Sequence, residues 1–147
     1  ILKFMININK ELKLQKKFND DVVTWEEAIA DYDNSKNKNL HVKESSPYGF
    51  FVTHNIDYLP KVKKVLDILN LNFAHLYCNL TTNAPTFGEH VDQVDVYFWQ
   101  CQGSTKWIIN EKIFILNSGD LLFVPSGVKH NVIPLCPRIG ISMSYEL

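Results

Sequence analysis

Residues 119–130, GDLLFVPSGVKH, decide the fold of this sequence. Gly119 begins a turn that leads into an apolar strand, Pro125 and Gly127 form a second turn, and His130 follows. Such a strand-turn-strand unit folds the chain back on itself. The unit can therefore present His130 to side chains of a distant strand.

Short strand-like runs separated by turn residues continue on both sides of this unit. They occupy residues 74–80, 94–101, 105–109, 112–116, 121–124, 128–133 and 138–145. Asn110-Glu111 and residues 117–120 supply turn chemistry between successive runs. Evenly spaced short strands indicate a mainly β sandwich or barrel instead of a parallel sheet.

The first half of the chain contains helix signals and one strand. Thr24 and Glu27 stand at capping-box spacing, which predicts a helix from Trp25 to about Asp33 and then a polar loop over 34–39. Aromatic and β-branched residues predict a strand over 48–54, and apolar residues at helical spacing predict a helix over 60–69. We expect a single domain, 1–147, in which residues 1–73 flank a barrel formed by residues 74–147.

Composition indicates an ordinary globular protein, with 46% hydrophobic and 21% charged residues. The net charge of −1 provides no field that would collect a polyanion, so we expect no nucleic-acid partner. Cys78, Cys101 and Cys136 lack CxxC spacing, which argues against a disulfide framework and a four-cysteine zinc site. No apolar run approaches the ~20 residues of a membrane span, and the start lacks a signal-peptide core. We therefore expect a cytoplasmic protein without a membrane partner.

A metal site is predicted where residues 88–95, GEHVDQVD, precede the 94–101 run. His90 and Asp92 are two apart, so on an extended strand both side chains point to one side and can contact one ion. With His130 they would form a set of two imidazoles and one carboxylate, which is typical of non-haem Fe(II) oxygenases. Zinc or nickel could occupy the same ligands. The alternative is that the three residues lie apart on unrelated surface loops.

The two segments together resemble JmjC-type, or cupin-like, Fe(II)- and 2-oxoglutarate-dependent oxygenases. Residues 119–130 resemble the second cupin motif, and residues 90–107 are similar to the metal-binding stretch of that family. The resemblance covers about residues 76–147 and is nearest in motif to bacterial ribosomal-protein hydroxylases. It implies a double-stranded β-helix, or cupin/jelly-roll, barrel with a short α/β N-terminal flank.

The resemblance also implies an activity and its cofactors. Fe(II) would be held by His90, Asp92 and His130, and 2-oxoglutarate would be decarboxylated to succinate while a substrate C–H bond is hydroxylated. In this family a Lys or Arg normally lies two residues before the position of Trp107, but here that residue is Thr105. Strand alternation points the adjacent Lys106 to the opposite face unless a bulge shifts the register, so Thr105 and Lys106 stay alternative candidates for 2-oxoglutarate binding.

Arg138 fits better as the group that binds the distal carboxylate of 2-oxoglutarate. It shares a strand face with Ser142, and many 2-oxoglutarate oxygenases use an Arg followed by a hydroxyl residue late in the barrel. A guanidinium gives a bidentate fit to a carboxylate. The alternative for Arg138 is a solvated position at the rim.

Several other residues are weaker candidates. Aromatic residues could line a substrate pocket but are more often core: Phe98, Trp99, Trp107 and Phe123. Asp95 and Gln100 match the family pattern and could equally be structural hydrogen bonders. We expect the remaining histidines to be incidental: His41, His54 and His75.

Two rival functions remain open at this point. One is a metal-dependent cupin enzyme that does not use 2-oxoglutarate, which the absence of a lysine at Thr105 favours and Asp92 disfavours. The other is a non-catalytic cupin-like binding domain. Ile1 is no ordinary initiator, which leaves the start of the chain open. Leu147 directly follows the last expected strand, so we expect none of the C-terminal regions of the ribosomal hydroxylases. The substrate, a small molecule or a protein side chain, and the oligomeric state stay open.

Overall fold

The computed structural model describes residues 11–37, 42–44, 49–82 and 86–147 of the protein. Over these residues the chain forms two helices and ten strands. In chain order they are β1 (Lys13–Gln15), α2 (Trp25–Asn37), β2 (Val42–Glu44), β3 (Phe50–Thr53), α3 (Pro60–Leu69), β4 (Phe73–Asn79), β5 (Val96–Gln102), β6 (Thr105–Ile109), β7 (Lys112–Leu116), β8 (Leu121–Val124), β9 (His130–Pro134) and β10 (Arg138–Ser144).

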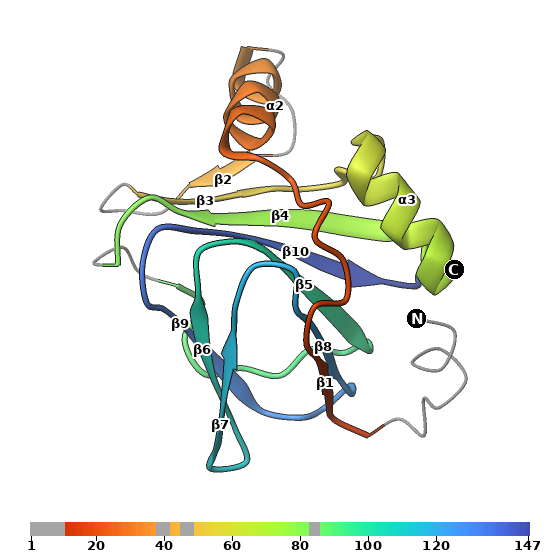
Figure 1. The fold of residues 1–147 in the computed structure, drawn as a ribbon, viewed down its shortest axis with the longest axis vertical. Helices are drawn as coiled ribbons and strands as arrows, with labels where there is room; N and C mark the ends of the chain where they lie inside the picture. Colours follow the sequence, from red (N-terminus) through yellow and green to blue (C-terminus); the bar gives the residue numbers. More distant parts are fainter. Residues whose placement is uncertain (1–10, 38–41, 45–48, 83–85) are drawn as a thin grey trace.

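The strands form two antiparallel sheets that face each other (Figure 1). The larger sheet has the order β1-β8-β5-β10-β4-β3-β2, and the smaller has the order β7-β6-β9. Neighbours in sequence therefore alternate between the sheets, as β5 lies in the larger one, β6 and β7 in the smaller, β8 in the larger and β9 in the smaller. This alternation is a double-stranded β-helix of the cupin or jelly-roll type, and the predicted fold class is confirmed.

Side-chain alternation gives the larger sheet two different faces. In β10, Ile139, Ile141 and Met143 belong to the apolar core under the helices, whereas Arg138 and Ser142 point into the barrel. A second apolar cluster fills the barrel between the sheets: Phe98, Trp107, Ile109, Leu116, Leu122 and Val124. The helix-side core is thus separated from the barrel interior by the sheet itself.

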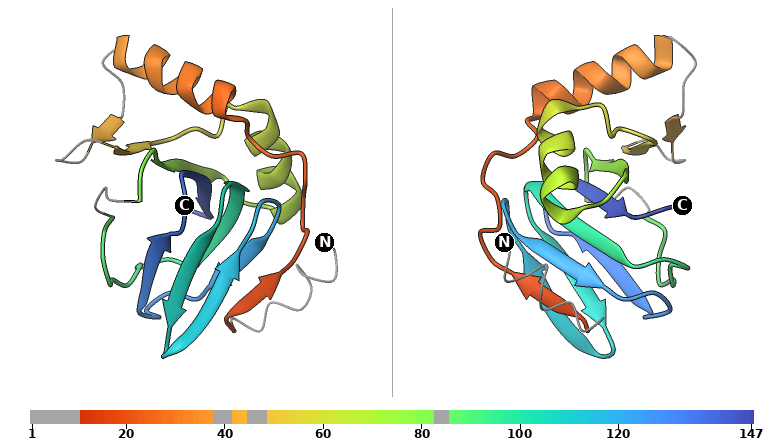
Figure 2. Two further views of the ribbon diagram at one scale, coloured as in Figure 1. Left: turned by 60° about the vertical axis from the view of Figure 1, so that its left-hand side comes forward. Right: turned by 90° about the vertical axis from the view of Figure 1, so that its right-hand side faces the viewer.

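The two helices cover the outer face of the larger sheet (Figure 2). The predicted capping box begins α2, because the Glu27 amide donates to Thr24 Oγ1 and the Thr24 amide donates to Glu27 Oε1, both at 3.1 Å. In α3 the apolar residues Val62, Val65 and Leu66 are buried against the sheet, as the helical spacing predicted. Pro60 begins this helix and the left-handed Asn70 ends it.

The expected end of the first helix was wrong, since α2 continues through Asn37 where a polar loop was predicted from residue 34. The reason is tertiary. Asp31 and Ser35 are buried, and the Tyr58 hydroxyl donates to Asp31, so polar side chains lie on the packed face of the helix. The sequence pattern also missed β1 and β2, which have three residues each. Residues 38–39 and Tyr48, included in the expected loop and strand, lie outside the described residues.

The strands of the second half were predicted closely. The bounds of β6, β7 and β8 are as expected, and β4, β5, β9 and β10 differ by one or two residues at their ends. Asn110 and Glu111 form the two-residue turn between β6 and β7, and both have positive φ, of 49° and 66°. A two-residue turn of that kind matches the twist of the strands it joins. None of the helices in the described ranges is long and apolar enough to cross a membrane.

Candidate metal centre

Backbone hydrogen bonds bring the two predicted metal-binding segments together. His90 forms an isolated antiparallel bridge with His130 at the start of β9, with N–O distances of 2.9 Å in both directions. The Gly127 amide then donates to the Asp92 carbonyl at 2.9 Å. The expectation of an extended strand over His90 and Asp92 was wrong, because Asp92 lies in the loop before β5. The loop nevertheless turns the carboxylate toward both imidazoles.

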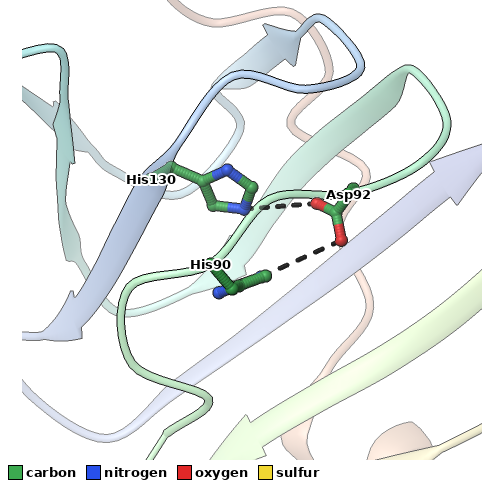
Figure 3. A group of neighbouring side chains, drawn as sticks. All are labelled: His90, Asp92 and His130. Atoms are coloured by element: carbon green, nitrogen blue, oxygen red, sulfur yellow. Dashed lines mark ion pairs between the residues drawn. The ribbon is translucent and has the colours of Figure 1, made fainter.

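The three side chains converge on one point (Figure 3). Asp92 Oδ2 lies 3.2 Å from His130 Nε2, and Asp92 Oδ1 lies 3.9 Å from His90 Nε2. One potential ligand atom from each residue lies within 4.8 Å of the other two. Since a metal bonds to such nitrogen and oxygen atoms at about 2.1 Å, small side-chain adjustments are enough for one ion to contact all three.

The histidine rings are held with Nε2 directed at this point. His90 Nδ1 lies 2.8 Å from the Gly88 carbonyl oxygen, and His130 Nδ1 lies 3.0 Å from that of Val128. A carbonyl can only accept, so Nδ1 carries the hydrogen in both rings. Nε2 of each ring is thereby the atom that would bind an ion, which is the arrangement found around metal-binding histidines.

The electrostatics of the site favour a charged carboxylate. The hydrogen bond from His130 lowers the pKa of Asp92 below its ordinary value, although burial opposes the shift. Burial would lower the pKa of His130, but its hydrogen bonds to Asp92 and to the Val128 carbonyl raise it overall. A half-buried carboxylate is thus held close to two imidazoles, and a metal cation would replace the proton that Asp92 shares with His130.

The triad opens into a cavity inside the barrel. Its wall is largely aromatic and apolar: Phe50, Tyr77, Phe87, Val96, Phe98, Trp107 and Val132. Trp107 stacks on the His130 ring, with centroids 5.4 Å apart and planes inclined by 24°. The wall thus presents mostly apolar surface beside the triad, and the stacked Trp107 ring restrains the plane of the His130 imidazole.

Arg138 lines the same cavity and is 1% exposed. Its Nε donates to Asn79 Oδ1 at 2.8 Å, while its Nη1 has no hydrogen-bond partner among the described residues. Burial lowers the pKa of Arg138 to about 10, which leaves the guanidinium charged at neutral pH. The alternative of a solvated rim position therefore does not describe Arg138.

Tyr77 and Ser142 also line this cavity. Burial raises the pKa of Tyr77, and the nearby Ser142 hydroxyl opposes this shift. The charge of Asp92 raises the pKa of Tyr77 and that of Arg138 lowers it, so the phenol is close enough to interact electrostatically with both groups. Ser142 and Arg138 share the inner face of β10, as their spacing predicted.

Thr105 and Lys106 are not part of the cavity wall. The Thr105 hydroxyl donates to Gln100 Oε1 at 2.9 Å and accepts from Trp107 Nε1 at 3.2 Å. Thr105 is fully buried, so its hydroxyl is committed to this internal network. Lys106 follows on the other face of β6, as strand alternation predicted. Of the four residues considered for 2-oxoglutarate binding, only Arg138 and Ser142 reach the cavity.

The weaker candidates divide between pocket and core. Phe98 and Trp107 line the cavity, whereas Trp99 and Phe123 lie in the helix-side core. Asp95 accepts from the Ser126 amide at 2.9 Å and so supports the loop next to the triad.

Sequence reasoning missed one histidine pair. His54 Nδ1, directly after β3, and His75 Nδ1, in β4, lie 3.2 Å apart. The two positions are 21 residues apart, and only the pairing of β3 with β4 brings them together. His41 lies outside the described residues.

Fold and site together define a cupin-like barrel with a site of two histidines and one carboxylate. Residues 52–114 match the family model described as the JmjC domain. The resemblance to that family is thereby confirmed for a part of the chain that includes His90 and Asp92. No curated protein matches the sequence significantly.

Solved structures with the same fold are distant in sequence. The structure is similar to YcfD, a ribosomal oxygenase from Escherichia coli, in complex with cobalt and 2-oxoglutarate, with a TM-score of 0.74 and 16% identity over 99% of this chain and 51% of that chain. A complex of YcfD with cobalt and succinic acid gives a TM-score of 0.74 at 14% identity, with the same coverage of 99% and 51%. A salicylate 1,2-dioxygenase from Pseudaminobacter salicylatoxidans gives a TM-score of 0.54 at 13% identity over 83% of this chain and 34% of that one. This chain thus spans about half the length of the E. coli oxygenase, and the likeness establishes a common fold.

Proposed function

We propose that this protein is an Fe(II)- and 2-oxoglutarate-dependent oxygenase that hydroxylates a small molecule or a protein side chain. One observation carries the proposal: a triad suited to a metal and a buried guanidinium, whose Nη1 lacks a hydrogen-bond partner among the described residues, line the same cavity. The triad fits a divalent ion, and Arg138 Nη1 fits a carboxylate oxygen. 2-Oxoglutarate carries both a metal-chelating end and a distal carboxylate.

Each part of the site has a distinct task in this proposal. His90, Asp92 and His130 would hold Fe(II), with Nε2 of each ring as ligand because Nδ1 is bonded to a carbonyl. Arg138 and Ser142 would hold the distal carboxylate of 2-oxoglutarate. Bound Fe(II) supplies dioxygen activation, coupled to decarboxylation of 2-oxoglutarate to succinate and CO₂ and to hydroxylation of a substrate C–H bond.

The surroundings support chemistry that requires the exclusion of water. The aromatic wall shields the triad on the side of Trp107 and Phe98. The Tyr77 hydroxyl remains protonated at neutral pH because burial raises its pKa, so it provides a neutral dipole beside the cavity. The hydrogen bonds of the two Nδ1 atoms keep the rings from turning when substrates bind.

An anaerobic titration tests this function. Addition of Fe(II) and 2-oxoglutarate to the protein should give the visible charge-transfer absorbance of the iron chelate, and air should then release succinate slowly even without substrate. His90→Ala should lose the absorbance. A folded, iron-loaded protein that gives neither signal would remove the proposal.

The same assay decides which residue binds the co-substrate. Arg138→Ala should raise the 2-oxoglutarate concentration needed for half of the absorbance by at least about tenfold, since a charge-assisted hydrogen bond is lost. Lys106→Ala is the matched control, because that side chain is outside the cavity. A loss in Lys106→Ala with a wild-type response in Arg138→Ala would reverse the assignment. A metal cupin enzyme that does not use 2-oxoglutarate would bind Fe(II) and show neither dependence.

A further inference from the structure

Asn79 and Arg138 form a buried pair on adjacent strands. They are directly opposite each other in the register of β4 and β10, and they are 0% and 1% exposed. A side-chain hydrogen bond joins them, in which Arg138 Nε donates to Asn79 Oδ1 at 2.8 Å. Arg138 Nη1 and Asn79 Nδ2 both lack a hydrogen-bond partner among the described residues. Buried donors without acceptors are rare in folded proteins and indicate a missing partner.

The charge of Arg138 is not balanced by its neighbours. The ionisable groups that act on it are Cys78 and Tyr77, and burial keeps both neutral, with the pKa of Cys78 raised to about 12. Arg138 Cζ lies 5.9 Å from the centroid of the Phe98 ring, so a cation–π interaction stabilises the positive charge in part. A buried cation normally requires a full counter-charge. The positive charge of Arg138 therefore lacks a counter-ion inside the barrel among the described residues.

Asn79 explains how this state is maintained. Its amide oxygen orients the guanidinium, but a neutral amide contributes no negative charge. A carboxylate at the same position would form a buried ion pair with Arg138 and remove the need for any other anion. Asn79 does not line the cavity itself, whereas Arg138 does, so the influence of Asn79 on a ligand would be exerted through Arg138.

We infer that Asn79 is the positioning and specificity-determining residue of the carboxylate site, because it orients Arg138 without neutralising it. The inference rests on the proposed function in assigning Arg138 to a ligand carboxylate. It adds that carboxylate recognition is built into the barrel without the metal. The class of ligand is a short dicarboxylate, of which 2-oxoglutarate is the metal-chelating member.

Thermal unfolding of metal-free protein in chelator tests the inference with glutarate, which has both carboxylates of 2-oxoglutarate but lacks the 2-oxo group. Glutarate should raise the unfolding temperature of the wild type in a saturable way, because a ligand that binds only the folded state stabilises it. Glutaramide, the neutral analogue, should not. Equal effects of glutarate and glutaramide would overturn the inference.

Two variants separate orientation from charge. Asn79→Asp should fold with an unchanged or higher unfolding temperature, lose the response to glutarate, and bind 2-oxoglutarate with Mn²⁺ at least tenfold more weakly in calorimetry. Asn79→Ala should keep a glutarate response, since the charge remains, but with roughly tenfold weaker affinity because the guanidinium is no longer oriented. The inference fails if Asn79→Asp responds as the wild type does, or if it responds no less than Asn79→Ala. Should Asn79→Asp not fold, a wild-type affinity in Asn79→Ala would overturn the positioning role by itself.

This experiment is independent of catalysis. Glutarate binding requires neither iron nor turnover, so it can succeed when the iron chelate fails to form, and the proposed oxygenase function would then be wrong while the carboxylate site stands. Conversely, a normal iron chelate together with unaffected Asn79 variants would refute only the role of Asn79.

Discussion

The two faces of the larger sheet differ in what their side chains contact, although the same strands supply both. The outer face packs on α2 and α3 through an apolar core that includes Leu66 and Ile141. The inner face carries Arg138, Gln100 and the cavity next to the triad. Because alternate residues of one strand supply both faces, stability and chemistry are separated by the thickness of the sheet. A substitution on one face should therefore leave the property of the other face nearly unchanged.

The largest effect expected from this separation concerns Leu66 on the outer side, which is 1% exposed. Leu66→Ala leaves a cavity between α3 and the sheet and should lower the free energy of unfolding by about 3 kcal/mol. Metal affinity should stay within about twofold of the wild type, because the triad lines the cavity on the barrel side of the sheet. Urea denaturation and calorimetric Mn²⁺ titration measure the two quantities. A parallel loss of metal affinity would show that the faces are coupled.

Gly140 offers a way to break the separation. It lies on the inner face of β10, and a Cβ at this position would lie 2.1 Å from Phe98 Cζ. Gly140→Ala should push the Phe98 ring into the cavity, lower the free energy of unfolding by about 2 kcal/mol and weaken 2-oxoglutarate binding at the same time. Ile141→Val, on the outer face of the same strand, is the control and should reduce only stability. Unchanged ligand binding in Gly140→Ala would mean that the ring moves elsewhere.

A smaller effect comes from the titration of His75 in β4. Burial and the adjacent His54 lower the pKa of His75 from 6.5 to about 4 in the folded state. Between pH 6.5 and about 4, His75 is protonated in the unfolded chain but not in the folded protein. The stabilisation that is present above pH 6.5 is therefore lost as the pH falls toward 4. The loss attributable to His75 should be about 1 to 2 kcal/mol, because partial exposure screens the effect. Urea denaturation across this range should show a shallower pH dependence for His75→Asn than for the wild type, and an identical profile would contradict the expectation.

Local chemistry made much of the barrel predictable. The turn at Asn110 and Glu111 and the alternation in β6 gave the correct strand bounds, because hairpin geometry depends on residues close in sequence. The same holds for α3, where Pro60 and the apolar spacing both lie within the helix. The convergence of His90, Asp92 and His130 was also expected, since the turn before His130 and the two-residue spacing of the other ligands were visible in the sequence.

Long-range packing produced the errors. The extension of α2 depends on burial of Asp31 and on its bond to Tyr58, 27 residues away. The pairing of His54 with His75 depends on the register of β3 and β4. The sequence also left two positions for Arg138, solvated or in the barrel, because strand alternation gives the face of a residue but not its depth. In each case the deciding contact joins segments whose proximity is a property of the whole fold.

The reciprocal backbone bridge between His90 and His130 has a mechanical consequence. His90 and Asp92 belong to the segment that leads into β5, and His130 begins β9. An ion bound by all three would therefore cross-link this segment to the smaller sheet. The bridge alone already sets the spacing of the two imidazoles, because main-chain atoms hold it. Exposed neighbours such as Glu89, Val91 and Lys129 are thus free to vary in chemical character while the ligand spacing is preserved.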